Sequence, residues 1–241
     1  MNDESLESKS LWYRYKTSVW SETTSEGATV HNIMRTLRSI RNVKHYAYVS
    51  CPITSGKRFY ELKLQKPDAQ VSNLHREVFG HNYNIGWILT EQVRSRRDFP
   101  VQFPADLVPT KQVWSQPHFQ ALWLSIIAEK CSELHMAPGW EYSNGCVEEF
   151  THAMQLRLGL PRAENLAFYN TKEDETSERV RMRNILAYDS QGNLISTHEA
   201  KHAISSAAQW ITEHGFNADK LLHCVDLLEW NDEMIQKGFY Q

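Results

Sequence analysis

The residues best suited to chemistry lie in the stretch Pro138-Gly-Trp-Glu-Tyr-Ser-Asn-Gly-Cys-Val-Glu-Glu149. Ser143 is a residue type that commonly caps helices, so we expect a helix to begin there, with Glu149 about one turn inside it. Gly145 would let a ligand approach the backbone closely. A carboxylate beside an anomeric carbon can attack it and form a covalent glycosyl ester, which water or another base then resolves. The same spacing also suits a glutamate that interacts only with the helix dipole.

A second stretch, Ser50-Cys-Pro-Ile-Thr-Ser-Gly56, combines small residues, hydroxyl groups and free backbone amides. It follows an apolar run over residues 45–49 that predicts a short buried strand. Such a loop suits the oxygens of a phosphate or a sugar. An ordinary turn is the alternative interpretation, because Pro52 and Gly56 also mark sharp loops.

The segments that position these two stretches alternate between strand and helix patterns. Strands are expected at 45–49, 100–103, 132–137 and 166–168, and helices at 29–42, 84–97, 118–130 and 146–158. This alternation predicts an α/β fold, a flavodoxin-like, doubly wound parallel sheet with helices on both faces. Ligands of such sheets bind at the carboxyl ends of the strands, which is where both stretches would lie.

Three regions are expected along the chain. Residues 1–43 form an N-terminal extension and helix, and residues 44–170 form the α/β core. Residues 171–241 contain a hairpin over 186–195, centred on Asp189-Ser-Gln-Gly192, and two closing helices over 200–213 and 218–237 that pack on the core.

The bulk composition is that of an ordinary globular protein. The chain has 241 residues, 41% of them hydrophobic, and a formal net charge of -3. Nucleic-acid-binding proteins usually carry a strongly positive surface charge, so we expect no nucleic-acid partner. No apolar run reaches the ~20 residues that span a bilayer, and the cysteines lack metal-site spacing. We therefore expect a cytoplasmic protein that does not associate with a membrane and that contains neither a metal ion nor a cofactor.

The two stretches resemble the two motifs of the nucleoside 2-deoxyribosyltransferase-like superfamily, which includes nucleotide 5′-monophosphate N-glycosidases. In that superfamily, Gly-Pro-Ile-Thr-Gly or a variant follows the first strand, as the stretch from Ser50 to Gly56 does here. In its second motif, Ser or Asp precedes the nucleophilic Glu by six positions, as Ser143 precedes Glu149. The motifs occur in the same order, and the resemblance covers roughly residues 44–165.

The resemblance implies an N-glycosidic bond hydrolase or transferase that acts on a nucleoside or nucleotide, in homo-oligomers with shared active sites. Glu149 would be the nucleophile, and a serine at position 143 is typical of the nucleotide hydrolases. Ser143 and either Ser50 or Thr54 would contact the 5′ end of the sugar. The other residues of the two motifs that we expect to bind the substrate are Pro52, Ile53, Gly56, Gly145 and Trp140, and Trp140 could instead be a packing residue.

The second acidic residue of this superfamily's active site is missing from its usual place in this chain. Relatives often carry an Asp on the helix before the third strand, where this chain has Ala121-Leu-Trp-Leu124. Departure of a base benefits from protonation, so we assign Asp106, which follows the second expected strand, as the assisting acid. Glu141 and Glu148 are alternative donors.

Two functions of other classes fit the same residues. A catalytically inactive nucleotide-sensing module would keep the pocket without turnover, and a scaffold protein would use the fold alone. Trp114, Gln116 and His118 lie in a loop before a helix, where aromatic stacking on a base is one interpretation and packing is the other. Cys51 and Cys146 lie in the motifs, but neither has a neighbouring base in the sequence that would activate a thiol.

Overall fold

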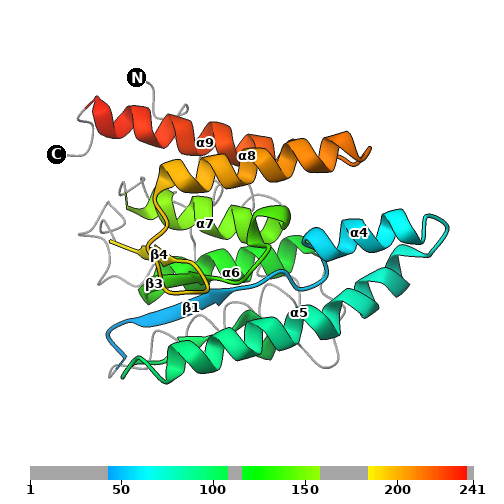
Figure 1. Ribbon diagram of the computed structural model, residues 1–241. Coiled ribbons are helices and arrows are strands. Elements are labelled where there is room, and N and C mark those ends of the chain that lie inside the picture. The colour runs from blue at the N-terminus through cyan, green and yellow to red at the C-terminus, as the bar shows by residue number, and fades with distance from the viewer. Residues whose placement is uncertain (1–42, 108–115, 158–183, 238–241) are drawn as a thin grey trace, which may run out of the picture.

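The structure is a computed structural model that describes residues 43–107, 116–157 and 184–237 (Figure 1). The expected helix at 29–42 and the expected strand at 166–168 lie outside these residues. Within them, four strands form one all-parallel sheet in the order β2-β1-β3-β4. They are β1 (Tyr46–Ser50), β2 (Val101–Gln102), β3 (Cys131–Met136) and β4 (Leu186–Tyr188). The predicted α/β class and the doubly wound parallel sheet are confirmed.

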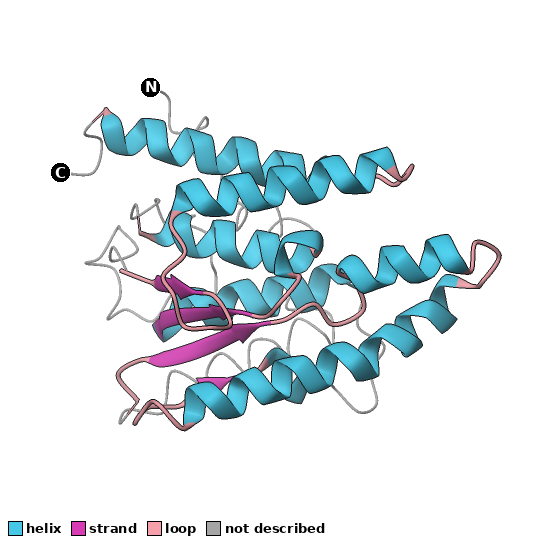
Figure 2. Ribbon diagram, in the orientation of Figure 1, coloured by secondary structure: helices cyan, strands magenta, loops and turns pink. Residues whose placement is uncertain are grey.

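The helices form layers on both faces of this sheet (Figures 1 and 2). They are α4 (Lys57–Gln65), α5 (Val71–Arg94), α6 (Gln116–Lys130), α7 (Asn144–Leu156), α8 (Thr197–Glu213) and α9 (Asp219–Gln236). Helix α5 covers one face, and α6 and α7 cover the other. Helices α8 and α9 form a further layer on α7, as expected for the two closing helices. Short 3-10 helices η1 (Pro104–Leu107) and η2 (Trp140–Tyr142) follow β2 and β3.

The central strand β1 is buried along its whole length, as expected for a parallel strand covered on both faces. Its side chains alternate between the two cores. Tyr46 and Tyr48 pack with α6 and α7, whereas Ala47 and Val49 pack with α5. The same alternation directs Ser50 to the α7 side of the sheet.

Helix α5 lies unusually close to the sheet because residue 86 is glycine. A Cβ atom at Gly86 would lie 2.6 Å from ring carbons of Phe103 and 2.9 Å from Sγ of Cys51. Both distances are shorter than a van der Waals contact, so a larger residue would push the helix away. This close approach brings α5 against the loop that follows β1.

One expected helix start was wrong, and one helix was missed. Helix α5 begins at Val71 instead of residue 84, and α4 was not expected at all. The buried apolar residues of this added part are Tyr60, which packs in the main core, and Leu62, Leu74 and Val78, which form a small separate cluster. Leu74 and Val78 lie on one helix face, but the buried apolar residues are sparse in a stretch that is otherwise rich in polar residues, so they gave too few positions for a helix to be predicted.

The hairpin expected at 186–195 is only partly present. The turn is confirmed, since Gly192 donates its N–H to the carbonyl of Asp189 at 3.1 Å. The first arm, however, is β4, which pairs in parallel with β3. The antiparallel pairing described after the turn is a single bridge between Tyr188 and Leu194. Ala187 is buried in the main core, and this burial favours pairing with the sheet over a free hairpin.

Candidate active site

The carboxyl ends of β1 and β3 meet where the sheet order reverses, and α7 begins directly beyond β3. A sheet of order 2-1-3-4 has its topological switch point between β1 and β3, the usual ligand position in this class of fold. Ala137 donates its N–H to the carbonyl of Ser50 at 2.8 Å, which ties the ends of the two strands together. The two predicted stretches therefore face each other across this point.

Glu149 lies at the centre of this junction, on α7, with only 5% of its surface exposed. Both carboxylate oxygens accept hydrogen bonds from β1. Tyr48 donates its hydroxyl to Oε1 at 2.8 Å, and Ser50 donates its hydroxyl to Oε2 at 2.6 Å. Two donors from neighbouring positions on one strand face hold the carboxylate in a single orientation.

Burial raises the pKa of Glu149 to about 7, although the hydrogen bonds from Ser50 and Tyr48 oppose this rise. The nearby charge of Glu148 raises the pKa further. Burial and the charge of Glu149 in turn raise the pKa of Tyr48 well above its ordinary value, so Tyr48 remains a hydrogen-bond donor. A carboxylate with such a pKa is ionised in a useful fraction of molecules near neutral pH.

A cavity of about 260 Å³ opens beside Glu149. This is near the lower end of the range for small-molecule sites, roughly 300–1,000 Å³. Hydroxyl-bearing and small residues of the two predicted stretches form one set of walls, and α5, η1 and α6 form the other. The lining residues are Cys51, Ile53, Thr54, Ser55, Phe79, Pro104, Ala105, Gln116, Phe119, Gln120, Trp123, Ser143, Gly145, Cys146 and Glu149.

The loop after β1 is held in shape by contacts from three directions. Gly56 has a φ of 88°, a conformation that favours glycine, and a Cβ there would lie 3.0 Å from Cβ of Pro52. Asn82 on α5 donates its amide to the carbonyl of Ser55 at 3.0 Å. The hydroxyls of Ser55 and Ser143 lie 2.9 Å apart and join the loop to the start of α7.

Ser143 caps α7 as the sequence predicted, because its hydroxyl accepts the N–H of Cys146 at 3.5 Å. Next to it, Gly145 lines the cavity and its carbonyl accepts the side-chain amide of Gln120 at 3.3 Å. Gln120 is buried on α6 and was missed as a site residue. Its position next to the apolar run of α6 gave no sign of a polar role.

A second cavity of about 370 Å³ shares Thr54, Ser55, Gln116, Gln120 and Gly145 with the first. Its other lining residues are His75, Asn144, Glu148 and Lys220. The two cavities thus form neighbouring parts of one hollow around the start of α7. Glu148 and Glu149, adjacent in sequence, line different parts of it.

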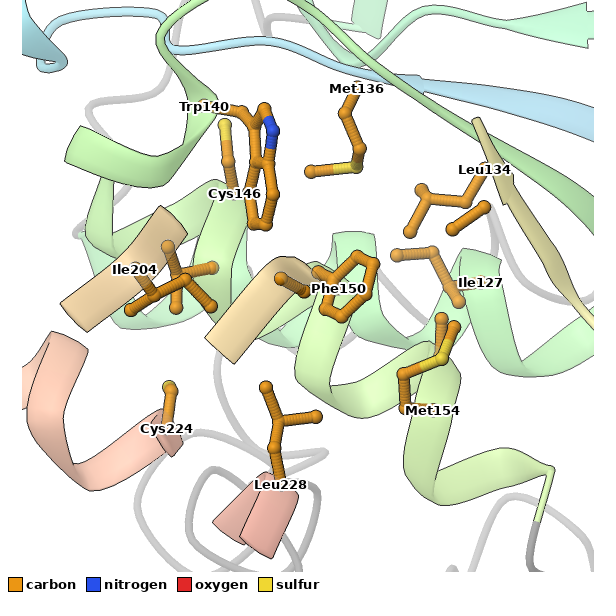
Figure 3. Close-up of a cluster of buried hydrophobic side chains, with 14 of the residues drawn as sticks. Ile127, Leu134, Met136, Trp140, Cys146, Phe150, Met154, Ile204, Cys224 and Leu228 are labelled. Atoms are coloured by element: carbon orange, nitrogen blue, oxygen red, sulfur yellow. The ribbon is translucent and has the colours of Figure 1, made fainter. Parts of the chain in front are cut away.

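Several predicted site residues do not line either cavity. Ser50 acts through its hydrogen bond to Glu149, and Pro52 and Gly56 shape the loop. Trp140 is 7% exposed and stacks on Phe150 with ring centroids 5.1 Å apart, in the hydrophobic core (Figure 3). Its side chain packs in the core because η2 turns it inward beneath α7.

Two of the three expected acid assistants, Asp106 and Glu141, line neither cavity. Asp106 is not among the described residues that line the cavity. It accepts a hydrogen bond from Tyr83 at 3.4 Å, and its Oδ2 lies 3.8 Å from the guanidinium of Arg94. Glu141 lies on η2, where burial raises its pKa. Of the three acids considered, Glu148 is the one that lines the hollow.

Among the other residues that the sequence suggested for the site, some line a cavity and some do not. Gln116 lines both cavities, His118 lines neither, and Trp114 lies outside the described residues. Burial and the charge of Glu149 raise the pKa of Cys51 to about 12, and the same causes raise the pKa of Cys146 well above its ordinary value. Both thiols therefore stay protonated beside Glu149, which disfavours a thiolate nucleophile.

Tyr48 is the most important residue that the sequence analysis missed. Its signal was present, because residues two apart on a strand point to the same face. Once Ser50 is placed against Glu149, Tyr48 must lie on the same side of β1. The aromatic lining residues Phe79, Phe119 and Trp123 carried no such signal, since an aromatic residue on a helix more often packs in a core.

We expect the raised pKa of Glu149 to make the stability of the protein depend on pH. The carboxyl titrates near 4.5 in its ordinary state and at about 7 in the folded protein, so between these values the folded state binds more protons than the unfolded state. The stability that Glu149 contributes is thus greatest below about pH 4.5 and is lost as pH rises from there through about 7, by about 3 kcal/mol. In Glu149→Gln this loss should vanish.

Urea unfolding at pH 5 and pH 8 measures this difference. The control is Glu233→Gln, whose carboxylate lies on the exposed face of α9, 3.2 Å from Lys237. Parallel pH profiles for the wild type and Glu149→Gln would contradict the assignment of a raised pKa.

No helix among residues 43–107, 116–157 and 184–237 is long and apolar enough to cross a membrane. The same residues contain no group of three or more His, Cys, Asp and Glu side chains arranged to hold a metal ion. Comparisons of the chain with protein-family models, with curated proteins and with solved structures found no match.

Proposed function

We propose that this protein cleaves or transfers the N-glycosidic bond of a nucleoside or nucleoside 5′-monophosphate, through a covalent intermediate between the sugar and Glu149. The observation that carries the proposal is the arrangement of Glu149: a buried carboxylate, held by Tyr48 and Ser50, at the edge of a cavity of about 260 Å³. The motif resemblance assigns the same residue independently.

The proposed reaction has two steps, in which an ester between the sugar and Glu149 is formed and then broken. One oxygen attacks the anomeric carbon as the bond from that carbon to the base nitrogen breaks, which gives a glycosyl ester. The hydroxyls of Tyr48 and Ser50 keep the carboxylate oriented toward the cavity during this attack. Water or a second base then attacks the ester carbon and releases Glu149.

The walls of the cavity suit the two ends of such a substrate. Thr54, Ser55 and Ser143 offer hydroxyl groups for the sugar, and the start of α7 adds backbone N–H groups that favour a 5′-phosphate. Phe79, Phe119 and Trp123 offer apolar faces for the planar base. We extend the proposal to a homo-oligomer, on the motif resemblance alone.

The direct test is incubation with a panel of ribo- and deoxyribonucleosides and their 5′-monophosphates, followed by chromatography of the free base. Mass spectrometry of the intact protein after rapid acid quenching would detect the glycosyl ester. Base release with an adduct on Glu149 supports the proposal. Calorimetric binding of a nucleotide without any base release would instead favour the nucleotide-sensing alternative, for which the position of Asp106 outside the cavity argues.

Tyr48→Phe should shift the pH dependence of this reaction. Removing the hydroxyl removes a hydrogen bond that lowers the pKa of Glu149, so the pKa should rise. A hydrogen bond to a charged group contributes about 1.5–3 kcal/mol, so the acid limb of kcat/KM should move up by roughly 1 to 2 pH units.

The matched control is Tyr46→Phe, on the same face of β1. Tyr46 donates its hydroxyl to the carbonyl of Ile126 instead of to Glu149. The acid limb should therefore stay in place in Tyr46→Phe. An acid limb that moves equally in both variants would show that Tyr48 does not act through Glu149.

A further inference from the structure

In the cavity beside Glu149, the charge is concentrated on one side chain, whereas Glu148 and Lys220 line the neighbouring cavity. Glu149 is the carboxylate of the lining, and the other described lining side chains are amides, hydroxyls, apolar groups and protonated thiols. The hydrogen bonds that Glu149 accepts come from neutral hydroxyls. A buried carboxylate in such surroundings is stabilised most by a positive charge on the ligand itself, since attraction between charges is strong away from water.

The aromatic residues of the lining favour the same kind of ligand. Phe119 and Trp123 on α6 form a stacked pair with ring centroids 6.2 Å apart, and Phe79 on α5 is partly exposed at the cavity. The faces of aromatic rings attract cations as well as planar heterocycles. A positively charged heterocycle would therefore gain from both the aromatic walls and Glu149.

The chemistry of the leaving group leads to the same class. A neutral base takes the electron pair of the broken bond and must be protonated, whereas a ring that already carries a positive charge becomes neutral. In the latter case Glu149 forms its bond to the anomeric carbon while the ring nitrogen keeps the electron pair. Water then displaces Glu149 and releases one proton to the solvent. No acid is consumed at the ring.

Resting on the N-glycosidic cleavage proposed above, we infer that this site is selective for N-glycosides whose leaving group is a cationic nitrogen heterocycle, such as a pyridinium or an N7-alkylated purine. The carboxylate of Glu149 would stabilise the positive charge that passes from the ring to the sugar. Phe79, Phe119 and Trp123 would hold the ring, and the hydroxyls of Ser55 and Ser143 would hold the sugar.

The test compares 7-methylguanosine with guanosine, a pair that differs in ring charge and one methyl group, each also as the 2′-deoxy compound. Nicotinamide riboside serves as a pyridinium probe. Each enzymatic rate is divided by the spontaneous rate of the same compound, because cationic glycosides are inherently more labile. We expect this ratio to be larger for the cationic member by about 10²-fold, the order of the attraction between the positive charge of the ring and Glu149 at a site away from water.

Two variants probe the aromatic walls. Phe119→Leu should lower kcat/KM for 7-methylguanosine by about two- to thirty-fold, the range of a lost cation–π contact, and should change that for guanosine less. Phe79→Leu, at a more exposed position, tests the same point where Phe119→Leu fails to fold.

The outcomes separate this inference from the proposed function. Equal or larger rate ratios for the neutral nucleosides would overturn the preference for cationic rings and leave the glycosidase function intact. Release of base from no member of the panel, cationic or neutral, would overturn both.

Discussion

Glu149→Gln is expected to lower base release by on the order of 10⁴-fold or more, because it removes the group that forms the covalent bond to the sugar. The amide has nearly the same shape as the carboxylate and can still pair with Tyr48 and Ser50. The fold should therefore survive. The variant should even be more stable than the wild type near pH 8, where the buried charge is costly.

Single-turnover chromatography of the released base measures this loss, and circular dichroism checks the fold. Glu233→Gln is the matched control, since its carboxylate is exposed on α9 and far along the chain from both motifs. It should retain wild-type activity. Full activity in Glu149→Gln would rule out Glu149 as the nucleophile, whereas loss of activity together with loss of structure would call for comparison at a lower temperature, where the variant is folded.

Trp140→Ala should destabilise the protein by about 3–5 kcal/mol, the usual cost of removing a large buried aromatic side chain. Trp140 is buried and stacks on Phe150, which is itself fully buried (Figure 3). Because Trp140 does not line the cavity, KM of the folded fraction should change little. Urea unfolding at constant pH measures the free energy, and steady-state kinetics at low temperature measures KM.

Trp87→Ala provides the comparison. Trp87 is 39% exposed on α5, where it contacts Tyr83 and Arg94 at the surface. Its loss should cost about 1 kcal/mol or less. A stability change in Trp140→Ala as small as that in Trp87→Ala, joined to a large rise in KM, would return Trp140 to the substrate contact that the sequence predicted.

The sequence allowed good predictions wherever a local pattern carries a strong physical signal. The uniformly apolar run of β1, the apolar helix α6 and the cap at Ser143 each depend on neighbouring residues, and each was confirmed. The first half of α5 and all of α4 were not predicted, because they are rich in polar residues and bury few apolar side chains. The pairing partner of β4 is not a local property and could not be read from its residues.

For the candidate site, the sequence by itself determined which residues lie at the carboxyl ends of β1 and β3, because short motifs after strands of a parallel sheet must meet at that edge. It thereby identified Glu149, Ser143 and the loop from Ser50 to Gly56. Only the tertiary structure decided what surrounds Glu149. These features are the hydrogen bond from Tyr48, the wall formed by Phe79, Phe119, Gln120 and Trp123, the burial of Trp140 and the pairing of Asp106 with Arg94. Each joins residues of different helices and strands. Such contacts depend on how helices pack against the sheet, and no local pattern encodes them.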